Sequence, residues 1–129
     1  MQACRAAENH GLLLEAGRVV SQAGDFDGAI ALHSDAVAQV PNSINARISL
    51  LVSLQLGARF EEMLPHARWL LGAAPQDSNS LRFAIQAGVW GGDLELAEAG
   101  YAQLQKTDPA QAQAARRFID SPPPTPVRR

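Results

Sequence analysis

Apolar residues recur at three- and four-residue intervals along most of the chain, which is the pattern of amphipathic helices packed on one side. In the first such segment the pattern rests on Leu12, Leu13, Ala16, Val19 and Val20, and it predicts a helix over residues 10–22. Five later segments show the same spacing, and each is bounded by turn-forming or helix-ending residues. They predict helices over residues 26–39, 44–56, 60–73, 78–90 and 94–107.

The six predicted helices form three helix-turn-helix units that repeat at a fixed interval. Each unit closes on a proline, and Pro41, Pro75 and Pro109 are each 34 residues apart. A period of that length is typical of stacked units, in which neighbours bury the apolar face that one helix pair cannot cover alone. The units span residues 10–43, 44–77 and 78–109, and we predict an all-α solenoid.

The segments outside these units are interpreted as a lead, a cap and a tail. Residues 1–9 are either an N-terminal lead or the remnant of a preceding repeat, because the period run backwards places the column of Pro41 on Ala7. Residues 110–120 predict a capping helix for the last repeat. Its apolar face would consist of Ala114, Ala115, Phe118 and Ile119. Residues 121–129, with the sequence SPPPTPVRR, indicate a disordered tail or a linker to further sequence.

Helix caps and breakers mark the turns within the units, with one irregularity. Gly24 and Asp25, and likewise Gly92 and Asp93, supply a breaker followed by an N-cap.

Pro65 lies about six residues into the helix predicted over 60–73 and lacks the N–H group that a helix interior needs. We expect that helix either to start later than its counterparts or to bend near Pro65.

Composition and charge restrict the class of partner. The formal net charge is −2 and the basic residues are scattered, whereas nucleic-acid binding normally requires a concentrated basic surface. We therefore expect no nucleic-acid partner. No apolar run approaches the length of a membrane span and the N-terminus has no signal-peptide core, so we expect no membrane partner and a cytoplasmic location. The single cysteine, Cys4, is expected to be a free thiol.

Aligned on the closing prolines, the three units share chemically similar columns. One column holds Ala29, Met63 and Ala97, another Ala36, Leu70 and Leu104, and a third His33, Ala67 and Tyr101. This pattern resembles the tetratricopeptide repeat, which has small residues where its two helices cross and a closing proline. Pentatricopeptide and Sel1-like repeats have similar periods but fit the length less well. The second unit departs most, because Arg47 replaces a large apolar residue and Met63 replaces a small one.

The resemblance implies a right-handed solenoid whose first helices line a concave groove that receives a peptide or a helix. Arg18 and Arg82 could bind carboxylates, and the amides of Asn45 and Asn79, which share one column, could hold a peptide backbone. The columns of the chaperone-binding members' carboxylate clamp are mostly changed here, so chaperone-tail binding is not expected. The predicted groove residues are Arg18, Asn45, Ile48, Ser49, Val52, Gln55, Asn79, Arg82, Phe83 and Gln86.

Catalytic signatures are absent from the sequence. The three histidines, His10, His33 and His66, have no metal-binding spacing, and no nucleophile elbow or phosphate loop is present. We interpret His33 as a packing residue and His66 as a surface residue. The carboxylates at the starts of the second helices complement the helix dipoles. We predict no enzymatic activity, no catalytic or metal site and no cofactor.

These observations predict a non-catalytic protein–protein interaction module for a protein or peptide partner whose identity the sequence does not give. Weak self-association stays open. The alternative is an accessory domain of a larger transferase or hydroxylase, for which the Pro-rich tail would be the linker; a bacterial source would suit the Ala- and Arg-rich composition. Trp69 and Trp90 are interpreted either as interface anchors or as packing residues.

Overall fold

The computed structural model describes residues 2–122, with side chains from Gly11 onward, and within that range it is all helical. The helices follow one another along the chain with short turns between them. They are α1 (Gln2–Gln22), α2 (Phe26–Gln39), α3 (Ile44–Leu56), α4 (Phe60–Ala73), α5 (Ser78–Gly91), α6 (Leu94–Thr107) and α7 (Pro109–Asp120). The predicted fold class, an all-α helical solenoid, is confirmed.

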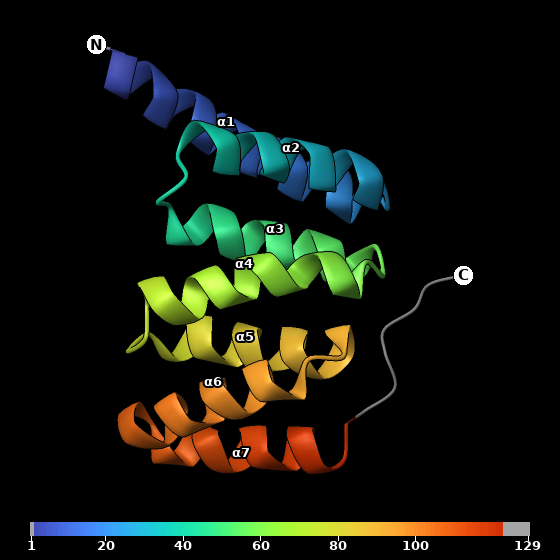
Figure 1. Ribbon diagram of the computed structural model, residues 1–129. Helices are drawn as coiled ribbons and strands as arrows, with labels where there is room; N and C mark the ends of the chain where they lie inside the picture. Colours follow the sequence, from blue (N-terminus) through green and yellow to red (C-terminus); the bar gives the residue numbers. More distant parts are fainter. Residues whose placement is uncertain (1, 123–129) are drawn as a thin grey trace.

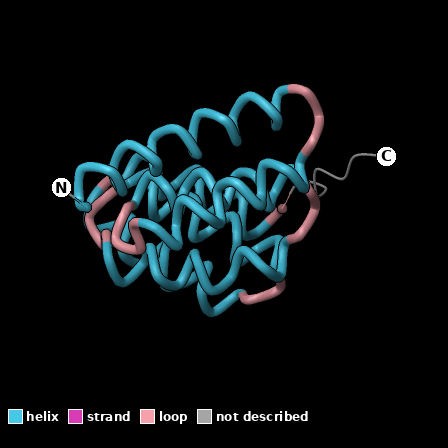
Figure 2. The backbone as a smooth tube through the Cα atoms, turned by 90° about the horizontal axis from the view of Figure 1, so that it is seen from above, coloured by secondary structure: helices cyan, strands magenta, loops and turns pink. Residues whose placement is uncertain are grey.

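The helices stack in chain order, from α1 at one end of the molecule to α7 at the other (Figure 1). Viewed from above, the turns gather at the two ends of the helices (Figure 2), as expected for antiparallel neighbours joined by short connections. Besides its neighbours in the chain, each odd-numbered helix contacts the next odd-numbered one: α1 contacts α3, α3 contacts α5 and α5 contacts α7. The odd-numbered helices therefore form one layer, and α2, α4 and α6 form the other.

Side-chain caps fix most of the helix starts. Asp25, Ser43, Asp77, Asp93 and Asp108 each accept a hydrogen bond from the backbone N–H three residues later, at 2.9 to 3.3 Å. Each bond satisfies one N–H group that the first helical turn leaves free. The caps predicted at Asp25 and Asp93 are confirmed.

The turn inside each helix pair contains one residue in the left-handed region. Gly24 has a φ of 91° and Gly92 a φ of 85°, which glycine adopts without steric cost. Ala58, 34 residues from each of them, has a φ of 61°. The preceding residue, Gly57, has a φ of −83°. In this turn the left-handed conformation therefore falls on Ala58, whose Cβ atom makes that conformation less favourable than it is for glycine.

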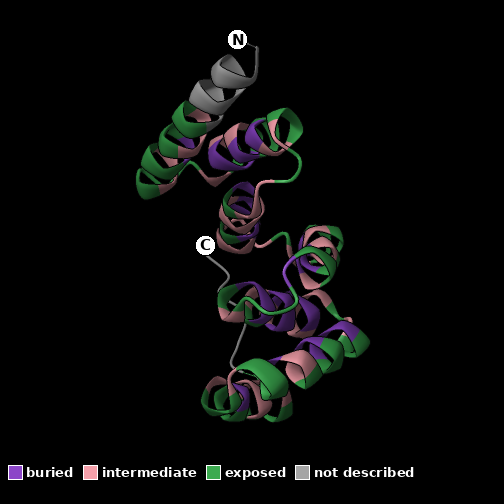
Figure 3. Cartoon of the chain, turned by 90° about the vertical axis from the view of Figure 1, so that its left-hand side faces the viewer, coloured by how far each residue is buried: buried purple, intermediate pink, exposed green. Residues whose placement is uncertain are grey.

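The buried residues lie mainly where neighbouring helices face each other (Figure 3), and most of the apolar ones form two clusters. Leu50, Leu54 and Leu70 of the middle unit are almost completely buried, whereas Phe60 and Leu71 are only partly buried around them. A second cluster joins α5 and α6 to α7 and contains Leu81, Ile85, Ala97, Leu104 and Ala112. Stacking of neighbouring units thus supplies the core that each pair lacks alone.

Three helix boundaries differ from the sequence predictions: the start of α1, the end of α5 at Gly91 rather than at residue 90, and the start of α7 at Pro109 rather than at residue 110. The first helix begins at Gln2 rather than at His10, so the proposed lead is helical from that residue onward. Its alanines favour helix, and no proline or cap interrupts it.

Helix α4 begins at Phe60 and continues through Pro65, which rules out a late start. Pro65 lies on the exposed side, where water can bond the carbonyl that loses its partner. The tail prediction, beyond Pro122, concerns residues outside the described range.

Candidate partner-binding surface

The layer of odd-numbered helices carries the residues predicted to line a groove, and two hollows open on it. The first lies between α1 and α3 and has a volume of about 250 Å³. Leu14, Ile48 and Val52 give it an apolar wall, and Arg18 and Ser49 lie on its edge. Val52 is 37% exposed, so its side chain is available to a ligand. Four predicted groove residues, Arg18, Ile48, Ser49 and Val52, thus meet in one place.

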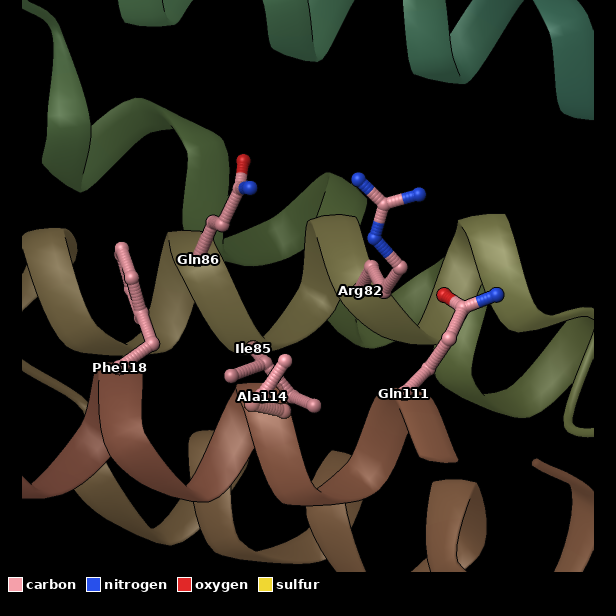
Figure 4. A pocket seen from close by; sticks show the side chains of 7 residues that line it. Arg82, Ile85, Gln86, Gln111, Ala114 and Phe118 are labelled. Atoms are coloured by element: carbon pink, nitrogen blue, oxygen red, sulfur yellow. The ribbon is translucent and has the colours of Figure 1, made fainter. Parts of the chain in front are cut away.

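The second hollow lies between α5 and α7 and has a volume of about 170 Å³. Gln111 and Phe118 extend from α7 toward α5, and Ile85 and Ala114 lie between them (Figure 4). Arg82 and Gln86 of α5 also line this space, and their polar ends extend to the side of α5 that is away from α7 (Figure 4). The hollow therefore combines an apolar floor with a guanidinium and amides at its edge.

The other predicted groove residues line neither hollow. Asn45 and Asn79 are exposed, and Asn79 accepts a hydrogen bond of 3.3 Å from Arg82. Gln55 is half-buried, and its Oε1 atom has no hydrogen-bond partner among the described residues. Phe83 packs against the main core cluster instead of projecting freely. Phe83 is therefore a core residue at least as much as a candidate for ligand contact.

The contribution of α7 to the surface was missed in the sequence. Adding 34 residues to Arg82, Phe83 and Gln86 gives Arg116, Arg117 and Asp120, which would face the hollow if α7 kept the register of the repeats. The residues of α7 that line the hollow are instead Gln111, Ala114, Ala115 and Phe118. Helix α7 is therefore rotated away from the register of the repeats.

In this orientation Arg116 contacts the outer layer. Its guanidinium bonds both carboxylate oxygens of Glu98 on α6 at 2.9 Å and lies 5.0 Å from the centre of the Tyr101 ring. The same side chain bonds Asp120 at 2.7 Å. Hydrogen bonding to Arg116 lowers the pKa values of Glu98 and Asp120 below their ordinary values.

The two arginines predicted to bind ligand carboxylates differ in their surroundings. Arg18 forms an ion pair with Glu15 one helical turn away, and their hydrogen bond lowers the pKa of Glu15. Arg82 has no carboxylate within ion-pair distance in the part of the chain that the structure describes. Only Arg82 thus combines a position at a hollow with an uncompensated charge.

His33 and Ser53 form a buried hydrogen-bonded link beneath the first hollow. The Nδ1 atom of His33 is 2.5 Å from Oγ of Ser53, and its Nε2 atom is 3.3 Å from the carbonyl oxygen of Leu14. The Ser53 hydroxyl donates in turn to the carbonyl of Ser49. These bonds join α1, α2 and α3, and they confirm His33 as a packing residue. Because Ser53 is only 1% exposed, its hydroxyl is not open to a substrate.

Arg47, His66 and Trp69 form a second polar cluster, between α3 and α4. Nη1 of Arg47 donates to Nδ1 of His66 at 2.9 Å, and Nη2 donates to the carbonyl of Pro41 at 3.2 Å. His66 was predicted on the surface, and the structure places it half-buried in this cluster. Burial lowers the pKa of His66 below its ordinary value of 6.5; Arg47 lowers it further, and Glu62 opposes the shift. Because Nδ1 accepts a hydrogen bond from Arg47, the cluster favours the neutral imidazole.

Both tryptophans are partly packed inside the solenoid. The guanidinium of Arg47 covers the Trp69 ring. Trp90 lies between Phe60 and Phe118, with ring-centre distances of 6.0 and 5.3 Å. Trp90 thus holds in place the aromatic ring that forms one wall of the α5–α7 hollow. These contacts favour the packing interpretation for both residues.

A search of the described residues finds no group of three or more histidine, cysteine, aspartate or glutamate side chains placed to bind a metal ion. Within the same range, the helices are too short or too polar to cross a membrane. The chemistry that the surface offers is therefore apolar contact, amide hydrogen bonding and ion pairing through arginine.

Comparisons with known proteins give no relative for this chain. No family model, curated protein or solved structure matches it.

Proposed function

We propose that the protein is a non-catalytic interaction module of the tetratricopeptide-repeat type, which binds a peptide or a helix of a partner protein along its layer of odd-numbered helices. The observation that carries the proposal is the placement of the two hollows on this layer. Each opens between successive odd-numbered helices, and each combines apolar walls with an arginine and polar side chains. Binding sites commonly have this composition.

The packing of the layers supports the assignment of roles. The helix pairs are held by buried leucines and alanines, and exposed residues of α1, α3 and α5 such as Arg18, Val52 and Arg82 lie outside the core clusters. Val52 illustrates this, because it is 37% exposed although its neighbours Leu51 and Ser53 are almost fully buried. Ligand pockets are lined mainly by apolar side chains with a few polar groups.

The partial match to the repeat pattern also supports this family type. The 34-residue period coincides with the stacking of the helix pairs, and the left-handed turn residues Gly24, Ala58 and Gly92 follow the same period. Proteins built from such arrays present extended surfaces to partners.

Site-specific photo-crosslinking tests the proposal. A photoreactive amino acid at Val52 or at Gln86 should crosslink the same partner in cells, because both positions lie on the proposed surface. The matched control is Leu94 on α6, which is 59% exposed on the other layer. Capture that is equally strong from Leu94, or that occurs from Leu94 alone, would contradict the proposed surface.

A further inference from the structure

The two layers differ in the charges that they carry. From Gly11 onward, the odd-numbered helices contain Arg18, Arg47, Arg82, Arg116 and Arg117 but only two carboxylates, Glu15 and Asp120. The even-numbered helices contain Asp27, Asp35, Glu61, Glu62, Glu95 and Glu98 but only two basic residues, Arg68 and Lys106. Helices α3 and α5 have no acidic residue at all. A chain with a slightly negative total charge therefore presents its excess positive charge on the layer with the hollows.

Most of these arginines are already engaged within the protein. Arg18 pairs with Glu15, Arg116 pairs with Glu98 and Asp120, and Arg47 is bonded to His66 beneath the surface. Arg82 donates only to the neutral side chain of Asn79, at 3.3 Å. It is exposed and lies at the edge of the α5–α7 hollow. Its guanidinium can therefore form a forked pair with a carboxylate from outside.

The space beside Arg82 suits an apolar side chain. Ile85, Ala114, Ala115 and Phe118 line it, and its volume of about 170 Å³ is that of a small recess rather than of a site for a large ligand. The Phe118 ring is supported by Trp90, so this wall is already in place before a ligand arrives. A preformed wall reduces the entropy lost on binding.

We propose that the α5–α7 hollow binds an acidic peptide segment, with an apolar side chain in the hollow and the side-chain carboxylate of a neighbouring aspartate or glutamate on Arg82. This inference rests on the proposed function and specifies the partner's chemistry. An internal carboxylate fits better than a chain terminus, because Arg82 is the only unpaired cation that lines the hollow among the described residues.

Selection of short random peptides against the full chain tests this inference. One library displays peptides with a blocked C-terminus and the other displays them with a free C-terminus. We expect the blocked library to yield sequences in which aspartate or glutamate lies close to leucine, isoleucine, methionine or phenylalanine. Arg82→Glu should weaken binding of a selected peptide by about tenfold or more, and replacement of its acidic residue by lysine should restore binding to that variant.

Two controls separate this effect from a general change in charge or fold. Lys106→Glu makes the same change in net charge on α6 in the outer layer and should leave the affinity unchanged. Ala114→Trp should block the hollow, whereas Ala102→Trp, at an exposed position of α6, should not affect binding. The circular dichroism of each variant should match that of the wild type.

The outcomes distinguish this inference from the proposed function. Enriched peptides without acidic residues, enrichment only with a free C-terminus, or equal effects of Arg82→Glu and Lys106→Glu would overturn the acidic-segment proposal while peptide binding itself stands. Failure of both libraries to yield any peptide that binds would contradict the proposed function as well.

Discussion

The guanidinium carbon of Arg47 lies 4.5 Å from the centre of the Trp69 ring, so a charged side chain joins α3 to α4 where the other units have a leucine in the same column. The arginine also bonds His66 and the Pro41 carbonyl. Within their units, α3 and α4 pack less extensively than α1 with α2 or α5 with α6. The middle unit is thus held partly by a polar cluster, with Met63 buried where the others have alanine.

This cluster makes stability depend on pH through His66. Because the folded-state pKa of His66 lies below its ordinary value of 6.5, the unfolded chain binds the proton more readily. The stabilising contribution is therefore complete above about pH 6.5 and is lost as the pH falls through the folded-state pKa. We expect the urea midpoint to decrease from pH 7.5 to pH 5.5.

The variant His66→Gln isolates this contribution, because glutamine can still accept from Arg47 but does not titrate. Its urea midpoint should change less over the same interval than that of the wild type. Parallel curves for the two proteins would show that His66 does not couple folding to pH. The carboxylates of Asp93, Glu98 and Asp120 do not contribute over this interval, because hydrogen bonding to arginine lowers their pKa values below the ordinary 3.8 and 4.5.

Ala58→Gly should stabilise the protein. Ala58 has a φ of 61°, a conformation that costs about 1 to 2 kcal/mol for a residue with a Cβ atom. Part of that gain is offset because glycine makes the unfolded chain more flexible. We expect a net gain of up to about 1 kcal/mol in the free energy of unfolding. The control Ala31→Gly, at an exposed position inside α2, should lose about 1 kcal/mol instead.

Gly88→Ala should destabilise the contact between α5 and α6. A Cβ atom at this position would lie 2.7 Å from the backbone nitrogen of Ala97 and 2.8 Å from the carbonyl oxygen of Asp93. Backbone atoms cannot rotate away as a side chain can, so the helices would have to separate. The cost should be about 1 to 3 kcal/mol, despite the higher helix propensity of alanine.

Gly72→Ala is the matched control, because a Cβ atom there meets nothing within 4 Å. Thermal unfolding of this variant should show no loss of stability, and a gain of up to about 1 kcal/mol is expected. A Gly88→Ala variant that is as stable as Gly72→Ala would contradict the close approach of α5 and α6.

Leu54→Ala should cost about 2 to 5 kcal/mol, because Leu54 is 2% exposed in the core of the middle unit. Gln113→Ala, at an exposed position of α7, should remain within about 0.5 kcal/mol of the wild type. Equal urea midpoints for these two variants would argue against the stacked core.

The sequence predicted the helices well, because apolar spacing, capping residues and the closing prolines all repeat with one period. The bounds of α2, α3, α4 and α6 agree with those predictions. The face that α7 turns toward α5 was predicted in part, because Ala114, Ala115 and Phe118 of its predicted apolar face line the hollow. The pairing of Arg116 with Glu98 could not be predicted, because the two residues lie on different helices. Similarly, the role of Arg47 depends on His66 and Trp69, which become its neighbours only after α3 packs on α4.

The surface was predicted in part. The residues of α1 and α3 that line the first hollow follow directly from their columns. Phe83 was expected to face a ligand but contributes to the core. The residue columns indicate which side of a helix faces outward, but they do not show whether a side chain at the edge of that side packs into the core. The recess beside Arg82 was not predicted, since half of its wall comes from the rotated α7.

The central claim is that the layer of odd-numbered helices binds the partner. Its most direct test is a backbone amide NMR titration of the ¹⁵N-labelled protein with a peptide obtained by selection. We predict that the largest shift changes occur on α3, α5 and α7, at residues such as Val52, Gln86 and Ala114. Changes confined to the exposed face of the other layer, around Leu94 and Glu95, would contradict the account.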